Sequence, residues 1–171
     1  RMRSGLAFDE TYANPLSDVT QMLFARPDAA AYAAALPLEQ PPGAFWKYSS
    51  GTSNILSLVL RRALRRAGAD YHAFPREALF GPLGMSSAVF ETDAAGTFVG
   101  SSFVYAAARD WARFGQFAME DSPWMRMATA PTPQSPDGRY GAHWWLRLPD
   151  DFGGNDGLPP DAFHALGHEG Q

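Results

Sequence analysis

Cysteine is absent from this sequence of 171 residues. Its absence excludes a disulfide framework, a thiol nucleophile and a cysteine-ligated zinc site. A fold without cysteine tolerates either redox state, so the composition leaves the cellular compartment open.

Lysine is almost as scarce, because Lys47 is the only one in the chain. Ala44 stands three residues before it, where a Ser-x-x-Lys sequence would have its serine. In that sequence a nucleophilic serine precedes a lysine by one helical turn and attacks an acyl group. The chain therefore lacks the nucleophile of this class of acyl-transfer site.

An excess of positive charge and long apolar runs are also missing. The sequence has 14 basic and 18 acidic residues and a net charge of -4. This balance predicts neither a basic surface that binds nucleic acid nor a polybasic patch that binds membranes. No stretch approaches the roughly 20 apolar residues that span a bilayer. The segment Arg1 to Gly5 has no signal-like apolar run, and the chain stops after Gly170 in a strand-to-turn segment, so we expect an internal piece of a longer protein.

Hydrophobic residues nevertheless make up 46% of the chain, which is ample for a folded core. Caps and stop residues predict short helices from Ser17 or Asp18 to about Ala25, from Asp28 to about Leu36, and from Asp70 towards Phe80. A further helix is predicted from about Ala106 to Met119, with apolar residues on one stripe. The stripe consists of Ala107, Trp111, Phe114 and Ala118.

The clearest helical pattern begins at about Ser50 and ends near Gly68. Apolar residues recur there at the spacing of one helix face, namely Leu56, Val59, Leu60, Ala63, Leu64 and Ala67. Arg61, Arg62, Arg65 and Arg66 take the other side, and the simplest interpretation is an exposed arginine face.

Extended segments are predicted around these helices. Proline at 41 and 42 disfavours a helix, so the segment Phe45 to Tyr48 should be extended. Residues 87–91 and 96–104 are predicted as short extended pieces, with a turn at Gly100-Ser101-Ser102 that could also line a cleft. Residues 139–148 and 162–166 have the composition of strands, and the loop between them is rich in glycine, proline and aspartate.

The order of several motifs resembles the serine hydrolases related to class C β-lactamases, penicillin-binding peptidases and family VIII esterases, including the 6-aminohexanoate-oligomer hydrolase branch. The resemblance covers nearly the whole chain. It is carried by Ser4-Gly5-Leu6, Pro42-Gly43-x-x-x-x-Tyr48-Ser49-Ser50-Gly51-x-x-Asn54, Leu79-Phe80-Gly81-Pro82-Leu83-Gly84-Met85, Ala108-Arg109-Asp110-Trp111-Ala112-Arg113-Phe114-Gly115, Tyr140-Gly141-x-x-Trp144-Trp145 and Gly167-His168-Glu169-Gly170-Gln171.

The resemblance implies an α+β fold of the β-lactamase/transpeptidase type, in which a helical lobe and an antiparallel sheet flank the active site. Residues 1–171 would be an internal segment of one catalytic domain. Residues 1–137 would be mainly helical lobe and loops, and residues 138–171 would be returning strands of the sheet. The part of the family fold that carries Ser-x-x-Lys would lie outside these residues.

The resemblance also implies site roles at the first motif. Tyr48 matches the tyrosine that takes the proton of the nucleophilic serine and later gives it to the leaving group. Ser50 stands where the family often has asparagine, and it would help to bind the substrate. An alternative is that Tyr48-Ser49-Ser50 is simply a helix N-cap preceded by a buried tyrosine.

The last motif matches the family's Lys-Thr-Gly or His-x-Gly strand. His168 would bind substrate, Gly170 would let the substrate backbone approach, and the backbone N–H of Gln171 would serve the oxyanion hole. Histidine carries only a partial positive charge at neutral pH, which favours ester or small amide substrates over β-lactam carboxylates. The alternative is a surface histidine in a turn.

We expect no metal and no cofactor. His164 and His168 would share one side of a strand without a further ligand, and residues 150–157 lack the ligand alternation and distal glutamate of a calcium loop. The interpretation is a serine hydrolase that forms an acyl-enzyme with a small ester or amide, although the isolated segment should be inactive. A non-catalytic penicillin-recognising or peptide-binding relative is the alternative.

Overall fold

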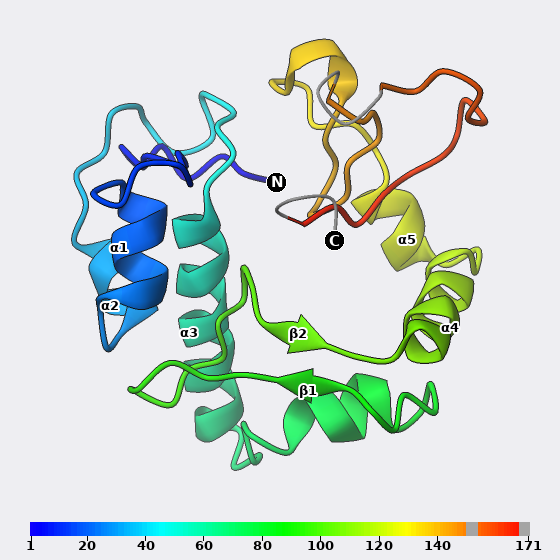
Figure 1. Ribbon diagram of the computed structural model, residues 1–171, viewed down its shortest axis with the longest axis horizontal. Helices are drawn as coiled ribbons and strands as arrows, with labels where there is room; N and C mark the ends of the chain where they lie inside the picture. Colours follow the sequence, from blue (N-terminus) through cyan, green and yellow to red (C-terminus); the bar gives the residue numbers. More distant parts are fainter. Residues whose placement is uncertain (150–153, 168–171) are drawn as a thin grey trace. The chain divides into compact units, whose positions relative to one another are not determined.

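The computed structural model describes residues 1–149 and 154–167 of the chain (Figure 1). The chain divides into two compact units. The large unit contains Leu6–Glu39 and Tyr48–Met119, and the small unit contains Arg1–Gly5, Gln40–Lys47 and Glu120–Gln171.

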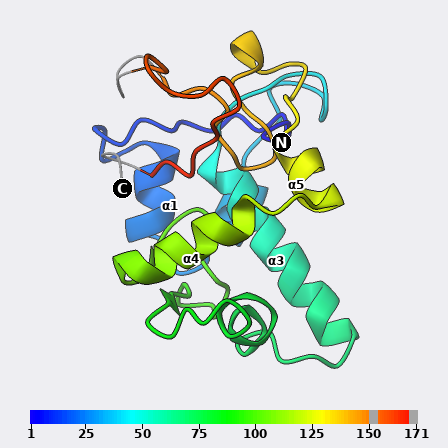
Figure 2. The same cartoon turned by 90° about the vertical axis from the view of Figure 1, so that its right-hand side faces the viewer.

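Helices dominate the large unit. They are α1 (Asp18–Phe24), α2 (Ala29–Ala34), α3 (Ser50–Arg66) and α4 (Ala108–Ala118), with one π-helical turn, η1 (Arg76–Phe80). The predicted caps are confirmed, because the side chain of Ser17 accepts a hydrogen bond from the Thr20 N–H and that of Asp28 from the Ala31 N–H. The axes of α3 and α4 are oblique to each other (Figure 2).

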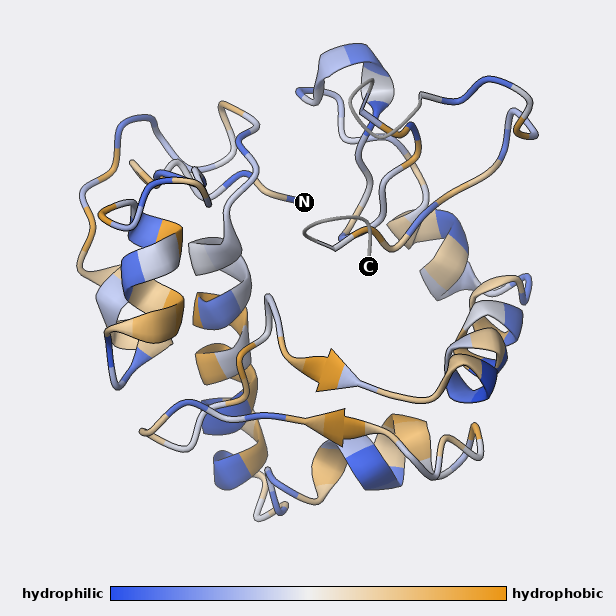
Figure 3. Cartoon of the chain, viewed as in Figure 1, coloured by the Kyte–Doolittle hydropathy of each residue, from blue (hydrophilic) through white to orange (hydrophobic). Residues whose placement is uncertain are grey.

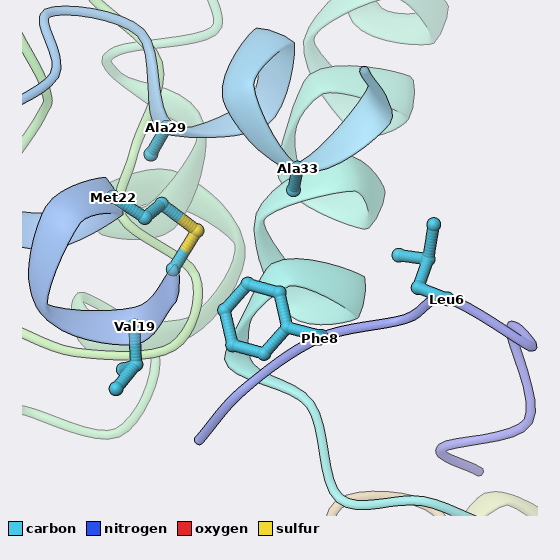
Figure 4. Close-up of a cluster of buried hydrophobic side chains, with 6 residues drawn as sticks. All are labelled: Leu6, Phe8, Val19, Met22, Ala29 and Ala33. Atoms are coloured by element: carbon cyan, nitrogen blue, oxygen red, sulfur yellow. The ribbon is translucent and has the colours of Figure 1, made fainter. Parts of the chain in front are cut away.

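The core of the large unit lies where α1, α2 and α3 pack together (Figure 4). It is formed by Leu6, Phe8, Val19, Met22, Ala29 and Ala33. Gly51 lets α3 approach this cluster, because a Cβ added there would lie 2.7 Å from Cε2 of Phe8 and 3.1 Å from the Cβ of Ala33. The glycine in the first turn of α3 is therefore required by packing.

A two-stranded antiparallel sheet completes the large unit. The strands are β1 (Val89–Phe90) and β2 (Val104–Tyr105), with Val89 opposite Tyr105. Figure 3 shows β1 as apolar and β2 as apolar in its first part only. They adjoin a second cluster of Phe80, Met85 and Ala88. The Arg76 guanidinium donates hydrogen bonds to the carbonyls of Met85 (2.9 Å) and Ala88 (2.5 Å), so the Phe-Gly-Pro-Leu-Gly-Met motif is a structural turn tied to η1.

The predicted helix at residue 50 is confirmed, but the prediction of its faces is partly wrong. Leu56, Val59 and Leu60 are 49%, 54% and 41% exposed. The buried residues of α3 are instead Ser50, Gly51, Ser53 and Asn54. The helix packs through this face of small, mostly polar residues because α2 and the loop at Gly100 approach it closely. A Cβ added to Gly100 would lie only 2.3 Å from Oγ of Ser57.

The arginine face of α3 also needs a correction. Arg62, Arg65 and Arg66 are exposed as predicted, but Arg61 is half-buried. Its guanidinium donates hydrogen bonds of 2.8 Å to the Ala95 carbonyl and to Oγ1 of Thr97. Arg61 therefore fixes the loop between β1 and β2 onto α3.

The small unit contains α5 (Pro123–Ala128) and a 3₁₀ turn, η2 (Pro136–Gly138). The sequence analysis did not predict α5, which Ser122 caps by accepting a hydrogen bond from the Met125 N–H. Arg1 reaches this unit's later part, because its guanidinium donates a 2.9 Å hydrogen bond to the Ala130 carbonyl.

The prediction of continuous strands at 139–148 and 162–166 is wrong for the described residues. Isolated bridges join Tyr140 with Trp145 and Trp145 with His164. Residues 140–145 cannot run straight because the Gly141 N–H donates to the Trp144 carbonyl and His143 has a positive φ of 64°. The assignment of residues 138–171 to returning strands of a complete sheet stays a prediction.

Candidate active site

The motif Tyr48-Ser49-Ser50 lies at the start of α3. Ser49 is the N-cap, with an extended backbone, and its side chain accepts a 3.2 Å hydrogen bond from the Thr52 N–H. Ser49 and Ser50 are buried, whereas Tyr48 is half-buried. Ser49 is therefore the N-cap that the alternative interpretation expects, whereas Tyr48 is not fully buried, and its catalytic role stays a prediction.

Glu10 is the main partner of this motif. Its carboxylate accepts a 2.8 Å hydrogen bond from the Ser50 N–H and a short one from the Ser50 hydroxyl. The Tyr12 hydroxyl lies 3.5 Å from the same carboxylate. Glu10, Tyr12 and Ser50 thus form a polar cluster, and the Tyr48 phenol lies near enough for the charges of Glu10 and Tyr12 to act on it. These four residues, called the polar cluster below, all belong to the large unit.

Burial governs the protonation of this cluster. It raises the pKa of the Glu10 carboxyl, although the hydrogen bonds from Ser50 act in the opposite direction. It also raises the pKa of Tyr12. The pKa of the Tyr48 phenol is raised by burial first, and then by the charges of Glu10 and Tyr12. Tyr48 is consequently a protonated phenol at neutral pH.

Asn54 links this cluster to the loop that precedes β2. The residue is 1% exposed, and its Nδ2 donates 3.0 Å hydrogen bonds to the Ser50 carbonyl and to the Ser101 hydroxyl. The predicted turn at residues 100–102 is present, since the Ser102 N–H donates to the Val99 carbonyl. The loop therefore lies against the buried face of α3.

Sequence reasoning missed Glu10 and Tyr12. Their alternation in Glu10-Thr11-Tyr12 is consistent with one side of an extended segment, but such a pattern is too common to indicate a site. The contact between Glu10 and Ser50 spans 40 positions, and no local pattern predicts it.

The other predicted site residues, His168, Gly170 and Gln171, lie outside the described residues. The expected pairing of His164 with His168 lies partly outside them as well, as does the loop at 150–157. Within residues 1–149 and 154–167, no group of three or more acidic or histidine side chains could hold a metal ion. Among the same residues, no helix is long and apolar enough to cross a membrane.

A hollow of about 210 Å³ lies elsewhere in the large unit. Its walls come from α1, the start of α2 and the loop between β1 and β2, and they include Met22, Arg26, Asp93 and Phe103. Asp93 is already engaged there, because its carboxylate accepts hydrogen bonds from the N–H groups of Ala29 and Thr97. None of the four residues of the polar cluster lines this hollow.

Two solved structures align with this chain. A proposed beta-lactamase from Bacteroides dorei DSM 17855 aligns with a TM-score of 0.57 and 17% identity, over 90% of this chain and 53% of its own. A beta-lactamase from Mycobacterium bovis aligns with a TM-score of 0.49 and 19% identity, over 78% of this chain and 48% of its own. The chain thus spans about half the length of these structures. No curated protein sequence matches it.

The family comparison covers the whole chain. The model of the family described as Beta-lactamase matches residues 1–171. Together with the first structural alignment, this match confirms the expected fold class, a partial α+β fold of the beta-lactamase type. The chain belongs to the beta-lactamase family.

Proposed function

We propose that the protein containing this chain is a serine hydrolase that forms an acyl-enzyme with an ester or a small amide. The observation that carries the proposal is the family match over residues 1–171, combined with the position of Tyr48 beside a buried polar cluster at the start of α3. The nucleophile would come from a Ser-x-x-Lys turn outside these residues, because this chain has none.

In this proposal Tyr48 transfers protons. As a protonated phenol it can donate a proton to the leaving group when the acyl-enzyme forms. It can accept the proton of the nucleophilic serine only where a cation lowers its pKa, because its surroundings in the large unit raise that pKa. The lysine of the Ser-x-x-Lys turn would supply that cation.

The remaining roles belong to the same proposal. His168 and Gly170 would bind the acyl part of the substrate, and the Gln171 N–H would stabilise the oxyanion of the tetrahedral intermediate. The Ser50 hydroxyl already donates to Glu10 and the residue is 3% exposed, so its contribution to substrate binding would act mainly through Glu10 and Tyr48.

The test uses the whole protein, a p-nitrophenyl ester series and mass spectrometry with a fluorophosphonate probe. We expect a covalent adduct, ester turnover, and a loss of roughly 10²–10⁴-fold in kcat on Tyr48→Phe. The isolated 171-residue chain should remain unlabelled. Turnover that is unchanged by Tyr48→Phe would refute the role of this residue.

A non-catalytic penicillin-recognising or peptide-binding protein is a second candidate. Saturable binding of a penicillin to the whole protein without covalent labelling and without turnover would support this candidate and exclude the hydrolase.

A further inference from the structure

Glu10 holds the residue that begins α3 at two points. Its carboxylate accepts from both the backbone N–H and the side-chain hydroxyl of Ser50. Two hydrogen bonds to one residue fix its position and the rotamer of its side chain, whereas a single bond would leave the hydroxyl free to rotate. Ser50 is buried, so this geometry does not compete with solvent.

These two hydrogen bonds also restrict the backbone that carries Tyr48. Tyr48 and Ser49 are the two residues before Ser50, and Ser49 is locked as the N-cap of α3. Asn54 adds a third constraint, because its Nδ2 donates to the Ser50 carbonyl. Both backbone polar groups of Ser50 and its hydroxyl are therefore engaged.

We propose that Glu10 is a positioning residue that holds Ser50, and through it Tyr48, in the place from which the Tyr48 phenol exchanges protons with the substrate. This inference rests on the proposed function. It adds an acidic residue that the sequence motifs did not include and that does not itself touch the substrate.

The charge of Glu10 matters as well as its shape. An ionised carboxylate can only accept, so the Ser50 hydroxyl must point its proton at Glu10. When Glu10 is protonated, its O–H competes as a donor and the Ser50 hydroxyl is free to turn. The other titratable groups near this carboxyl are Asp9, Tyr12 and Tyr48, and both tyrosines stay protonated below pH 8.

The first experiment is an NMR titration of the whole protein between pH 4 and 8. We expect the Ser50 amide signal and the Tyr48 ring signals to shift together, at a midpoint above the ordinary pKa of glutamate, because the pKa of Glu10 is raised. Neither signal should shift in this way in Glu10→Gln. A Ser50 signal that titrates while the Tyr48 ring signals stay fixed would reduce Glu10 to a helix cap and overturn the proposal.

The second experiment measures ester hydrolysis by the same variants. Glu10→Gln keeps the size and one acceptor oxygen but loses the charge, so we expect kcat to fall about tenfold at pH 7 with KM within twofold. We expect kcat of the wild-type protein to fall at acid pH as Glu10 is protonated, and Glu10→Gln should lose this dependence. Glu77→Gln, at an exposed position of η1, is the matched control and should behave like the wild-type protein.

The two experiments separate the possible failures. If the wild-type protein hydrolyses neither esters nor small amides, the proposed function fails, and the NMR titration alone still decides whether Glu10 positions Tyr48. If the protein is active and Glu10→Gln keeps both its kcat and the fall of kcat at acid pH, the positioning role is wrong.

Discussion

Asp110 shows how one buried carboxylate organises two segments of the large unit. It is 3% exposed and accepts hydrogen bonds from the Ser87 N–H (2.8 Å) and the Ser87 hydroxyl (2.7 Å). The Ser87 hydroxyl in turn accepts a hydrogen bond from the Ala107 N–H just before α4. Arg113, one turn along α4, forms an ion pair with Asp110. These contacts tie the start of α4 to the segment before β1.

Ser87→Ala should therefore destabilise the large unit in a pH-dependent way. The hydrogen bonds from Ser87 lower the pKa of Asp110, so their contribution is fully present above the pKa of an unfolded aspartate, about 3.9. It is lost as pH falls through the lower native pKa. Urea denaturation at pH 7 and at pH 3 measures the difference, which should shrink at pH 3. Ser86→Ala, at the exposed neighbouring position, should change little.

The residues of the candidate site were only partly predictable from the sequence. The motif order located Tyr48 and Ser50 and indicated that they open a helix. Glu10 and Tyr12 were missed because their contact with Ser50 depends on how α1 and α2 return the chain to α3. Asn54 stood in the motif without a role, because only the fold shows that it joins Ser50 to Ser101.

Among the elements, α3 shows where periodicity succeeds and where it fails. Its length and its caps follow from local rules, and both agree with the prediction. The choice of buried face does not follow from hydropathy, because a face of serine, glycine and asparagine packs more closely than leucine can. Hydropathy also fails to predict the position of Arg61, because its long side chain is held by a hydrogen bond to the loop carbonyl of Ala95.

Two glycines in helices, Gly51 in α3 and Gly115 in α4, should respond oppositely to substitution by alanine. Gly51→Ala places a methyl group 2.7 Å from the Phe8 ring and should cost about 1–3 kcal/mol of unfolding free energy. Gly115→Ala, in α4, meets nothing within 4 Å and should add about 0.5–1 kcal/mol through helix propensity. Thermal denaturation of the two variants checks this. Equal effects would show that the close contact at Gly51 relaxes without cost.

At the scale of the whole molecule, the exposed apolar stripe of α3 governs the behaviour of the isolated chain. Leu56, Val59 and Leu60 lie on one face and are each about half exposed. The chain spans about half the length of the structures with which it aligns, and it is rich in such exposed apolar side chains. We therefore expect the isolated chain to associate with itself.

The double substitution Leu56→Gln and Leu60→Gln should reduce this association. Because both side chains are largely outside the core, the free energy of unfolding should stay within about 0.5 kcal/mol of the original value. Static light scattering measures the association, and circular dichroism measures the unfolding. The matched control is Leu16→Gln, which removes an 80% exposed leucine from outside the stripe and should leave the scattering unchanged.

The sequence order of the two units has a consequence for synthesis on the ribosome. The large unit is complete once Met119 has been made, whereas the small unit needs residues that precede and follow it. Arg1 and its partner Ala130 are 129 positions apart. At about 5–20 residues per second, Ala130 is therefore synthesised about 6–26 s after Arg1. The first five residues and Gln40–Lys47 can therefore bond to each other early, but they meet their partners in the last part of the small unit only after the large unit has been synthesised.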